Sequence, residues 1–142
     1  MLTARRATDV RKNFSRFIDG VIYERPALVQ RNRDLLVALS FDHLEEILRL
    51  YRFTMEYKQE DDGSYSGSLE GFGLAANAPS ITALRYQLAQ ELIEYAEQYE
   101  ADFPLYFRAP NRTSHFPYVY HVLIQSNLEN VAGLIDAKLE RI

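Results

Sequence analysis

Seven residues near the start of the chain have the types and spacing that suit contact with nucleic acid. They are Arg5, Arg6, Arg11, Lys12, Asn13, Arg31 and Arg33. Arginine can make paired hydrogen bonds to guanine or to phosphate, whereas lysine more often neutralises one phosphate. Arg11 falls in the first turn of an expected helix, where nearby free amide groups can face the phosphates. These residues predict a DNA-binding segment, and ordinary solvated charges are the alternative interpretation.

The charges are divided unevenly along the chain. Up to Phe53 there are ten Lys or Arg and seven Asp or Glu, a net charge near +3, whereas the rest has six and thirteen, near −7. Such an asymmetry indicates two roles, with a polyanion as the partner of the basic part. We therefore expect two domains, a basic module over residues 1–53 and an acidic α+β domain over residues 54–142.

Few other residues could do chemistry. Glu56 and Glu70 could be paired carboxylates of a nuclease, but nothing supplies a third metal ligand. His115 and His121 lie beside aromatic residues, where a histidine more often packs or hydrogen-bonds than binds a metal. The chain has no cysteine, which excludes disulfides and thiolate ligands. We predict no catalytic site, no metal and no cofactor.

The elements that must position the basic residues follow from the apolar pattern. Thr8 and Asp9 predict the start of a helix that continues through Val21 with one apolar stripe. This stripe comprises Val10, Phe14, Phe17, Ile18 and Val21. Two strands, 27–31 and the more buried 35–40, should then form a hairpin about the turn 32–34. An edge strand over 3–6 and a short helix from Asp42 to Tyr51 complete the module.

The acidic part predicts a small antiparallel sheet packed against helices. Alternating apolar residues indicate strands at 53–58, 65–70 and 74–76. Ser80 should cap a long helix whose outer face carries Glu91, Glu94, Glu97 and Glu100. Another strand is expected over 116–124, and a last helix from Ser126 to Leu139. The five tyrosines of this region could form a protein-binding face, although a core role is the stronger reading. They are Tyr95, Tyr99, Tyr106, Tyr118 and Tyr120.

The composition limits the cellular setting. The chain has 142 residues, of which 47% are hydrophobic, so it can bury a core. No apolar run reaches the roughly 18 to 20 residues that a membrane-spanning helix needs. The first residues lack the apolar stretch of a secretory signal. We expect a cytoplasmic protein with no membrane partner.

The ordered motifs of residues 1–53 resemble the Phd/YefM antitoxins. The carriers are the run Thr8-Asp9-Val10-Arg11-Lys12-Asn13-Phe14-Ser15, the segment Leu28-Val29-Gln30-Arg31-Asn32, and Ser40-Phe41-Asp42-His43-Leu44. The resemblance implies a homodimer and an operator-binding surface built from the first strand, the start of the first helix and the hairpin tip. Arg11 then matches the family's helix arginine and Arg31 its hairpin arginine. Asn13 matches an asparagine that either holds the helix start or touches DNA, and we add Arg5, Arg6, Lys12 and Arg33 from charge and placement.

The acidic part resembles the HicB-type antitoxins, which have a partial ribonuclease-H-like β-β-β-α unit. The carriers are Tyr57, Asp62-Gly63-Ser64-Tyr65, Leu69-Glu70-Gly71-Phe72-Gly73 and Ala83-Leu84. In that family the unit binds a toxin or oligomerises and lacks an active site. The family's proline in the glycine break is absent here.

Together the two resemblances imply a non-enzymatic antitoxin and autorepressor. Its expected partners are operator DNA, a second copy or a higher homo-oligomer, and a cognate toxin, often a ribonuclease, masked by the acidic domain. Phd/YefM antitoxins usually neutralise through a segment that is disordered when free, so a folded acidic domain is a departure. Three alternatives stay open: a transcriptional regulator with a ligand-sensing or assembly domain and no toxin, an interaction protein that binds no DNA, and a metal-dependent nuclease of ribonuclease-H type.

Overall fold

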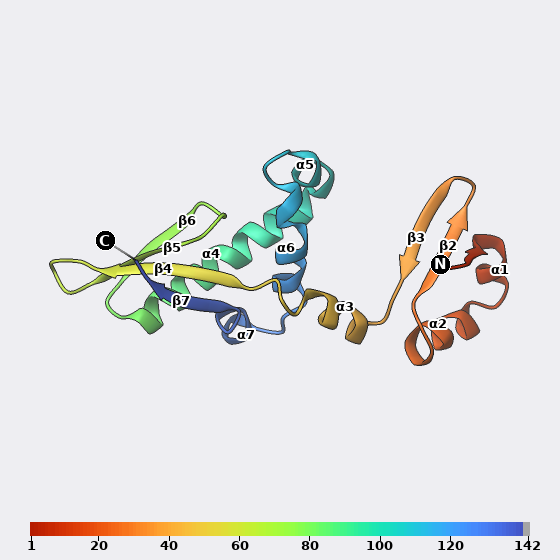
Figure 1. Cartoon of the computed structure of the whole chain (residues 1–142), viewed down its shortest axis with the longest axis horizontal. Coiled ribbons are helices and arrows are strands. Elements are labelled where there is room, and N and C mark those ends of the chain that lie inside the picture. The colour runs from red at the N-terminus through yellow and green to blue at the C-terminus, as the bar shows by residue number, and fades with distance from the viewer. Residues whose placement is uncertain (141–142) are drawn as a thin grey trace. The chain divides into compact units, whose positions relative to one another are not determined.

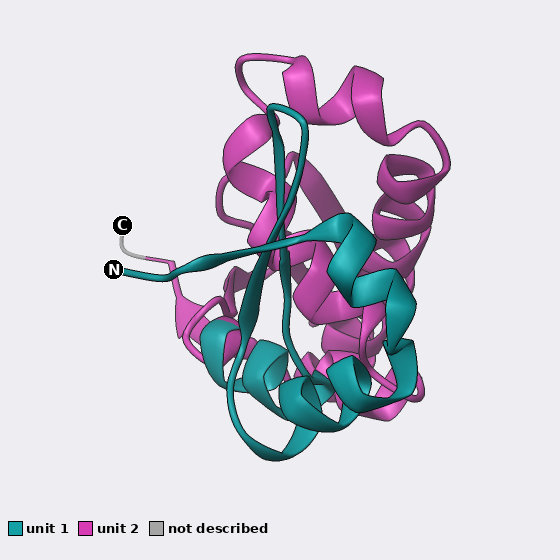
Figure 2. Ribbon diagram, turned by 90° about the vertical axis from the view of Figure 1, so that its right-hand side faces the viewer, with its two compact units in different colours: residues 1–47 teal, residues 48–142 magenta. Residues whose placement is uncertain are grey.

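The computed structural model describes residues 1–140, which form two units (Figures 1 and 2). Unit 1 comprises residues 1–47 and unit 2 begins at Leu48. The division falls earlier than the sequence boundary at Phe53. The predicted α+β class is confirmed, since helices accompany two separate sheets. Arg141 and Ile142, the end of the predicted acidic domain, lie outside the described residues.

Unit 1 is a three-stranded sheet with three helices. Its elements are β1 (Ala4–Arg6), α1 (Ala7–Lys12), α2 (Phe14–Tyr23), β2 (Ala27–Arg31), β3 (Asp34–Ala38) and α3 (Phe41–Leu48), the last ending at the first residue of unit 2. The strand order is β1-β2-β3, with β1 parallel and β3 antiparallel to β2. The predicted edge strand, hairpin and short helix are therefore confirmed, although α3 ends before Tyr51.

The single helix predicted from Thr8 to Val21 is wrong, because the chain leaves helical geometry at Asn13 (φ −141°, ψ 67°). Asn13 instead caps α2, its side-chain oxygen accepting a hydrogen bond from the Arg16 amide at 3.4 Å. Thr8 is not a cap, since α1 begins at Ala7 directly after β1. The apolar stripe continues across the break, so periodicity alone could not reveal it.

Much of the apolar surface of unit 1 is exposed, contrary to prediction. Its core consists of Phe17, Val21, Ala27 and Val29. The strand predicted to be more buried, β3, leaves Leu35, Leu36 and Val37 between 51% and 62% exposed. On α2, Phe14 and Ile18 are 50% and 40% exposed. The prediction assumed that one chain buries its own apolar strand, and unit 1 has too few elements to cover both faces of this sheet.

Unit 2 is a four-stranded sheet packed against helices. Its elements are β4 (Phe53–Gln59), β5 (Tyr65–Leu69), β6 (Leu74–Ala78), α4 (Ile81–Ala101), α5 (Phe103–Arg108), a 3-10 turn η1 (Thr113–His115), α6 (Phe116–Leu123), α7 (Leu128–Ala132) and β7 (Ile135–Leu139). The strand order is β6-β5-β4-β7, and β7 is parallel to β4. The predicted strand-strand-strand-helix order is confirmed. Ser80 caps α4, its hydroxyl accepting a hydrogen bond from the Ala83 amide at 3.1 Å.

Two predictions near the C-terminus are wrong. The segment expected as a strand over 116–124 is the helix α6, with Pro117 in its first turn, where proline is tolerated. Its buried Val119 and Val122 are three residues apart, a helical spacing. The last predicted helix stops at Ala132, and the chain continues as β7. There Ile135, Ala137 and Leu139 alternate along the sequence with Asp136 and Lys138, which is the period-two pattern of a strand, although Ile135 alone is buried among these five residues.

The core of unit 2 lies between the sheet and α4. Phe53 and Met55 from β4 meet Leu84, Leu88 and other apolar residues of α4, all nearly inaccessible to solvent. A side chain at Gly67 on β5 would begin only 2.8 Å from the Leu84 side chain, so α4 packs directly on the backbone there. No helix within residues 1–140 is long and apolar enough to cross a membrane.

Candidate nucleic-acid interface

The end of β1 and the tip of the β2–β3 hairpin form one shallow groove. Parallel pairing places Arg6 opposite Gln30, next to Arg31. The groove has a volume of about 400 Å³, and its lining residues are Arg6, Ala7, Thr8, Gln30, Arg31 and Asn32. The lining contains two guanidinium groups and several hydrogen-bonding side chains and no carboxylate. This combination suits a phosphodiester backbone or a base edge.

The hairpin tip presents Arg31 in an exchangeable ion pair. Arg31 and Asp34 face each other at the end of the ladder, with the guanidinium 3.4 Å from the carboxylate. Both side chains are mostly exposed, so the pair contributes little stability and Arg31 can turn to a phosphate. Between them, Asn32 has a φ of 55°, which asparagine tolerates, and its carbonyl accepts a hydrogen bond from the Gln30 side chain at 3.0 Å. Arg33 is exposed at this turn.

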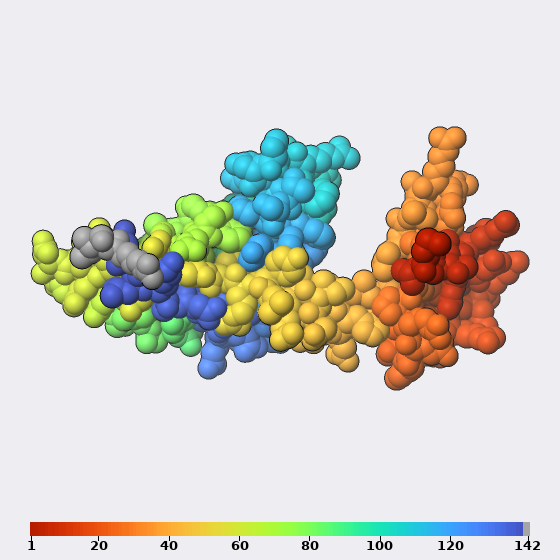
Figure 3. All heavy atoms as spheres, in the orientation of Figure 1, coloured from red at the N-terminus to blue at the C-terminus, as the bar shows by residue number. Residues whose placement is uncertain are grey.

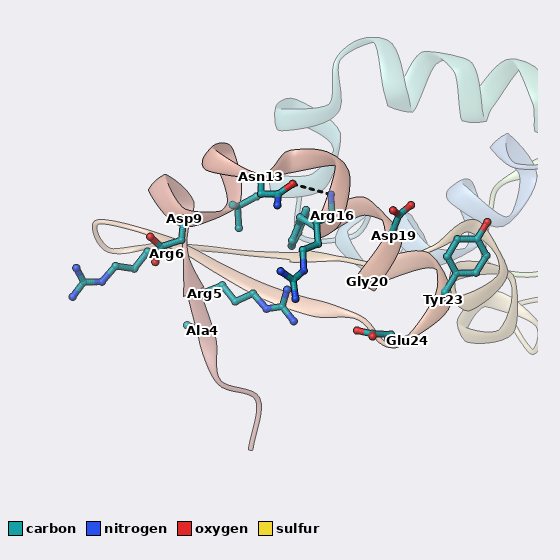
Figure 4. Close-up of a pocket in the computed structure, with 12 residues that line it drawn as sticks. Ala4, Arg5, Arg6, Asp9, Asn13, Arg16, Asp19, Gly20, Tyr23 and Glu24 are labelled. Atoms are coloured by element: carbon teal, nitrogen blue, oxygen red, sulfur yellow. Dashed lines mark hydrogen bonds between the residues drawn. The ribbon is translucent and has the colours of Figure 1, made fainter.

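A second and larger groove of about 730 Å³ lies between β1 and the helices (Figure 4). Arg5 and Arg16 both extend into it, and the Arg5 guanidinium carbon lies 6.0 Å from the centre of the Phe17 ring. Three acidic residues also line this groove, namely Asp9, Asp19 and Glu24. Because these carboxylates offset the arginines, the smaller groove is the better site for a polyanion.

The remaining predicted residues lie on the surface of α1 and at the start of α2. Arg11 is exposed, but it stands in the last turn of α1 and not in the first, so the expected help from free helix amides is absent. The Lys12 ammonium lies 3.9 Å from the Asp9 carboxylate, and both are exposed. Asn13 holds the start of α2, which is one of its two predicted roles. Neither Arg11 nor Lys12 lines either groove.

Several residues that line the grooves escaped the sequence analysis. Thr8 and Gln30 line the smaller groove, and Arg16 lines the larger one. Gln30 joins the groove because the parallel register of β1 with β2 sets it opposite Arg6, and no local sequence pattern specifies that register. Arg16 could not be assigned to the larger groove from the sequence, because the helix break at Asn13 changes the direction in which the residues after it point.

The positive charge of unit 1 is concentrated before α3. Residues 1–40 include eight Lys or Arg and four Asp or Glu, whereas Asp42, Glu45 and Glu46 of α3 add three negative charges. Both grooves lie within residues 4–32, in the basic portion. An anionic partner would therefore be drawn to the sheet and the first two helices.

The histidines considered as metal ligands make internal hydrogen bonds in unit 2. His115 lies 2.6 Å from the Tyr95 hydroxyl through Nδ1 and 2.8 Å from the Gly71 carbonyl through Nε2. Burial lowers the pKa of His115, and the charge of Arg112 lowers it further, against the effect of the Gly71 carbonyl. His121 Nδ1 lies 2.7 Å from the Tyr51 carbonyl. Among residues 1–140, no three His, Asp or Glu side chains form a group that could hold a metal.

The predicted tyrosine face is mostly interior. Tyr95 and Tyr99 belong to the core of unit 2. Tyr106, Tyr118 and Tyr120 are half-buried. The core role is therefore confirmed for the two residues on α4.

One family model and one solved structure resemble this chain over nearly its whole length. A family model described as PHD-like, an antitoxin of RelE/RelB toxin–antitoxin systems, matches residues 1–137. A crystal structure from Syntrophomonas wolfei subsp. wolfei, described as an antitoxin part of a proposed toxin/antitoxin system, is 37% identical and superposes with a TM-score of 0.94. That match covers 98% of this chain and 100% of the other. No curated protein matches the chain.

Proposed function

The chain belongs to the PHD-like family of RelE/RelB antitoxins, and on this premise we propose that unit 1 binds operator DNA as a homodimer while unit 2 neutralises a cognate toxin. An antitoxin of such a system has a toxin as its partner. The Phd/YefM resemblance of residues 1–53 supports the operator-binding role, and the HicB-like order of unit 2 supports toxin binding by a folded domain. We place both activities in the cytoplasm, where operator DNA is accessible.

The smaller groove is the observation that carries the DNA-binding proposal. It brings Arg6 and Arg31 together although they are distant in sequence, and it adds Thr8 and Gln30 as hydrogen-bonding groups. Two arginines can neutralise adjacent phosphates or reach a guanine, while hydroxyl and amide groups position the backbone. Arg5, Arg11, Lys12, Asn13, Arg16 and Arg33 are proposed as supporting contacts.

The exposed apolar surface of unit 1 supports a homodimer. Ile18 and Ile22 follow Phe14 at helical spacing on α2, and Leu35 and Val37 share one face of β3. Soluble monomers rarely leave so much apolar side-chain surface in water. A second copy of unit 1 would cover it, and a two-fold dimer would present its two grooves to a two-fold symmetric operator.

Binding to the DNA upstream of this chain's own gene tests the proposal. The full chain is titrated against that DNA and against unrelated DNA of equal length at two salt concentrations. We expect preferential binding that weakens steeply with salt, because neutralised phosphates release counterions. Arg6→Ala/Arg31→Ala should lose about 2 to 6 kcal/mol of binding free energy, at about 1 to 3 kcal/mol for each contact.

Arg25→Ala is the matched control, because Arg25 is exposed and precedes β2, at the opposite end of that strand from Arg31. It should bind within about threefold of the wild type, since a distant surface charge makes only a screened contribution. Equal binding of upstream and unrelated DNA by the wild type would contradict operator recognition. Equal losses in the double variant and in the control would contradict the groove as the contact site.

A further inference from the structure

An aromatic ladder lies on the surface of unit 2 where α5 meets α6. The Phe103 ring stacks on Phe107 with centroids 5.3 Å apart and on Tyr120 with centroids 6.0 Å apart. Phe116 packs edge-on against all three rings. Figure 3 shows this part of unit 2, in cyan and light blue, as a projecting lobe. The ladder is therefore a rigid platform, which loses little conformational entropy when a partner binds.

The outer edge of the ladder is open to solvent. Leu105 on α5 is 65% exposed and Phe107 is 37% exposed. Phe103 and Phe116 pack inward against the core of unit 2, so the lobe is anchored to the fold. Exposed aromatic and aliphatic side chains on a rigid base are typical of the energetic centre of a protein interface.

A carboxylate row on α4 borders the ladder. Ile93, Glu97 and Glu100 share one face of α4, because they are separated by four and three residues. Tyr99, next to Glu100 on α4, has its ring centroid 5.8 Å from that of Phe103, so this end of α4 abuts the ladder. Burial raises the pKa of the Tyr120 hydroxyl, and the charge of Glu100 raises it further. Ile93 and Glu97 also line a groove of about 210 Å³ between α4 and the residues of α6 and α7. Acidic and apolar groups are thus contiguous here.

We propose that this α4–α5–α6 face, defined as Ile93, Glu97, Glu100, Leu105, Phe107 and Tyr120, is the docking surface for a basic segment of the cognate toxin. Apolar side chains of that segment would pack on Leu105 and Phe107 and enter the groove. Its lysines and arginines would meet Glu97 and Glu100. The proposal rests on the toxin-neutralising function proposed above and assigns it a site.

Charge decides the occupant. The face as defined carries the carboxylates Glu97 and Glu100 and no Lys or Arg, so it repels nucleic acid and anionic membranes. A symmetric contact between two copies would bring the same net-negative surface together twice, which is unfavourable. A basic protein partner is attracted, and complementary charge speeds its encounter.

The test uses the full chain and, as the probe, the protein encoded by the adjacent gene. Glu97→Lys/Glu100→Lys should raise the Kd by about tenfold or more, because attraction becomes repulsion. Leu105→Glu should do the same by placing a charge in the apolar contact. Asp61→Lys/Glu140→Lys is the matched control, because both residues are exposed and the charge change is the same. Asp61 follows β4 and Glu140 follows β7, so both lie at the end of the sheet where these strands finish and outside the α4–α5–α6 face. It should bind as the wild type does.

The outcomes separate the two proposals. If the wild type binds the probe and both Glu97→Lys/Glu100→Lys and Leu105→Glu bind it with the same Kd as the wild type, the docking surface is wrong while toxin binding stands. If the wild type does not bind, the neutralising function fails and the surface fails with it. If Leu105→Glu alters the oligomeric state of the free chain, the face joins copies of this chain and the proposal is overturned. Circular dichroism and operator binding, both expected to be unchanged, verify that the variants are folded.

Discussion

Units 1 and 2 differ in how completely each buries its own apolar residues. Unit 2 has seventeen buried residues in one continuous core, including the large side chains Phe53, Met55 and Tyr99. Unit 1 buries four and exposes apolar side chains on both α2 and β3. A domain with so small a core is only marginally stable by itself. The difference indicates that unit 2 is a finished fold, whereas unit 1 leaves apolar surface uncovered, the surface assigned to the proposed dimer.

Deleting a core side chain of unit 2 should have the largest effect. Leu92→Ala is expected to cost about 2 to 5 kcal/mol, because it removes buried methyl groups and leaves a cavity. Chemical denaturation followed by the tyrosine signal measures the loss. The unfolding midpoint of unit 2 should not depend on protein concentration. A midpoint that depends on concentration would show that unit 2 is also stabilised by association, and it would contradict the difference between the two units.

A charge on the apolar face of unit 1 should have the next largest effect. Ile18→Glu should raise the Kd of the proposed dimer about 100-fold, a change of about 2.7 kcal/mol, because the exposed 40% of the side chain becomes buried on association. Sedimentation over a range of concentrations measures this. Ser15→Glu, on an exposed position of the same helix, is the control. Unchanged association in the Ile18 variant would remove the basis for an incomplete unit 1.

Acidification should weaken unit 2 through His115. Because burial lowers its folded-state pKa below the ordinary value of 6.5, the unfolded chain binds more protons. This contribution is fully present above pH 6.5 and is lost as the pH falls below that value. Melting temperatures of unit 2 between pH 7.5 and 5.5 should fall less in His115→Gln than in the wild type. Identical slopes in both proteins would contradict this assignment.

The ion pair between Arg52 and Asp136 should have the smallest effect. The guanidinium donates hydrogen bonds of 2.9 and 3.1 Å to the carboxylate and one of 2.9 Å to the Gly133 carbonyl. The hydrogen bonds from Arg52 lower the pKa of Asp136, so the pair stabilises unit 2 above the ordinary pKa of 3.8 and loses this as pH falls. The two side chains are 40% and 59% exposed, so solvent screens the pair and Arg52→Ala should cost only about 0.2 to 1 kcal/mol at neutral pH. Lys58→Ala is the comparison, because the Lys58 ammonium lies 3.8 Å from the Glu60 carboxylate in a looser surface pair. An equal loss of unfolding free energy in that variant would contradict a specific contribution of the Arg52–Asp136 pair.

The sequence predicted the elements whose periodicity reflects contacts within the chain. The strands β4 to β6 and the helix α4 were visible because their apolar residues pack against one another. The burial of β3 was predicted wrongly, since an apolar strand that is exposed in the single chain has the same sequence pattern as one in a core. The strand β7 was missed because its apolar residues also fit a helical spacing, and only its pairing with β4 decides between the two.

The candidate DNA site was predictable in composition but not in grouping. Arg6 and Arg31 were identified from charge, yet their meeting depends on the parallel register of β1 with β2, which no local pattern specifies. Arg16 was missed because the break at Asn13 interrupts no apolar period. Residue types thus indicated the kind of chemistry, and long-range pairing decided which residues share a groove.

The parallel pairing of β7 with β4 has a consequence for how the chain is made. β4 is the first strand of unit 2 to leave the ribosome, and its neighbour β7 is the last. Until Leu139 emerges, one edge of β4 has unpaired backbone groups and can join a strand of another nascent chain. Unit 1 is released much earlier. Translation therefore completes unit 1, the proposed DNA-binding part, first, and a ribosome that stalls before β7 leaves an aggregation-prone edge on unit 2, the part proposed to bind the toxin.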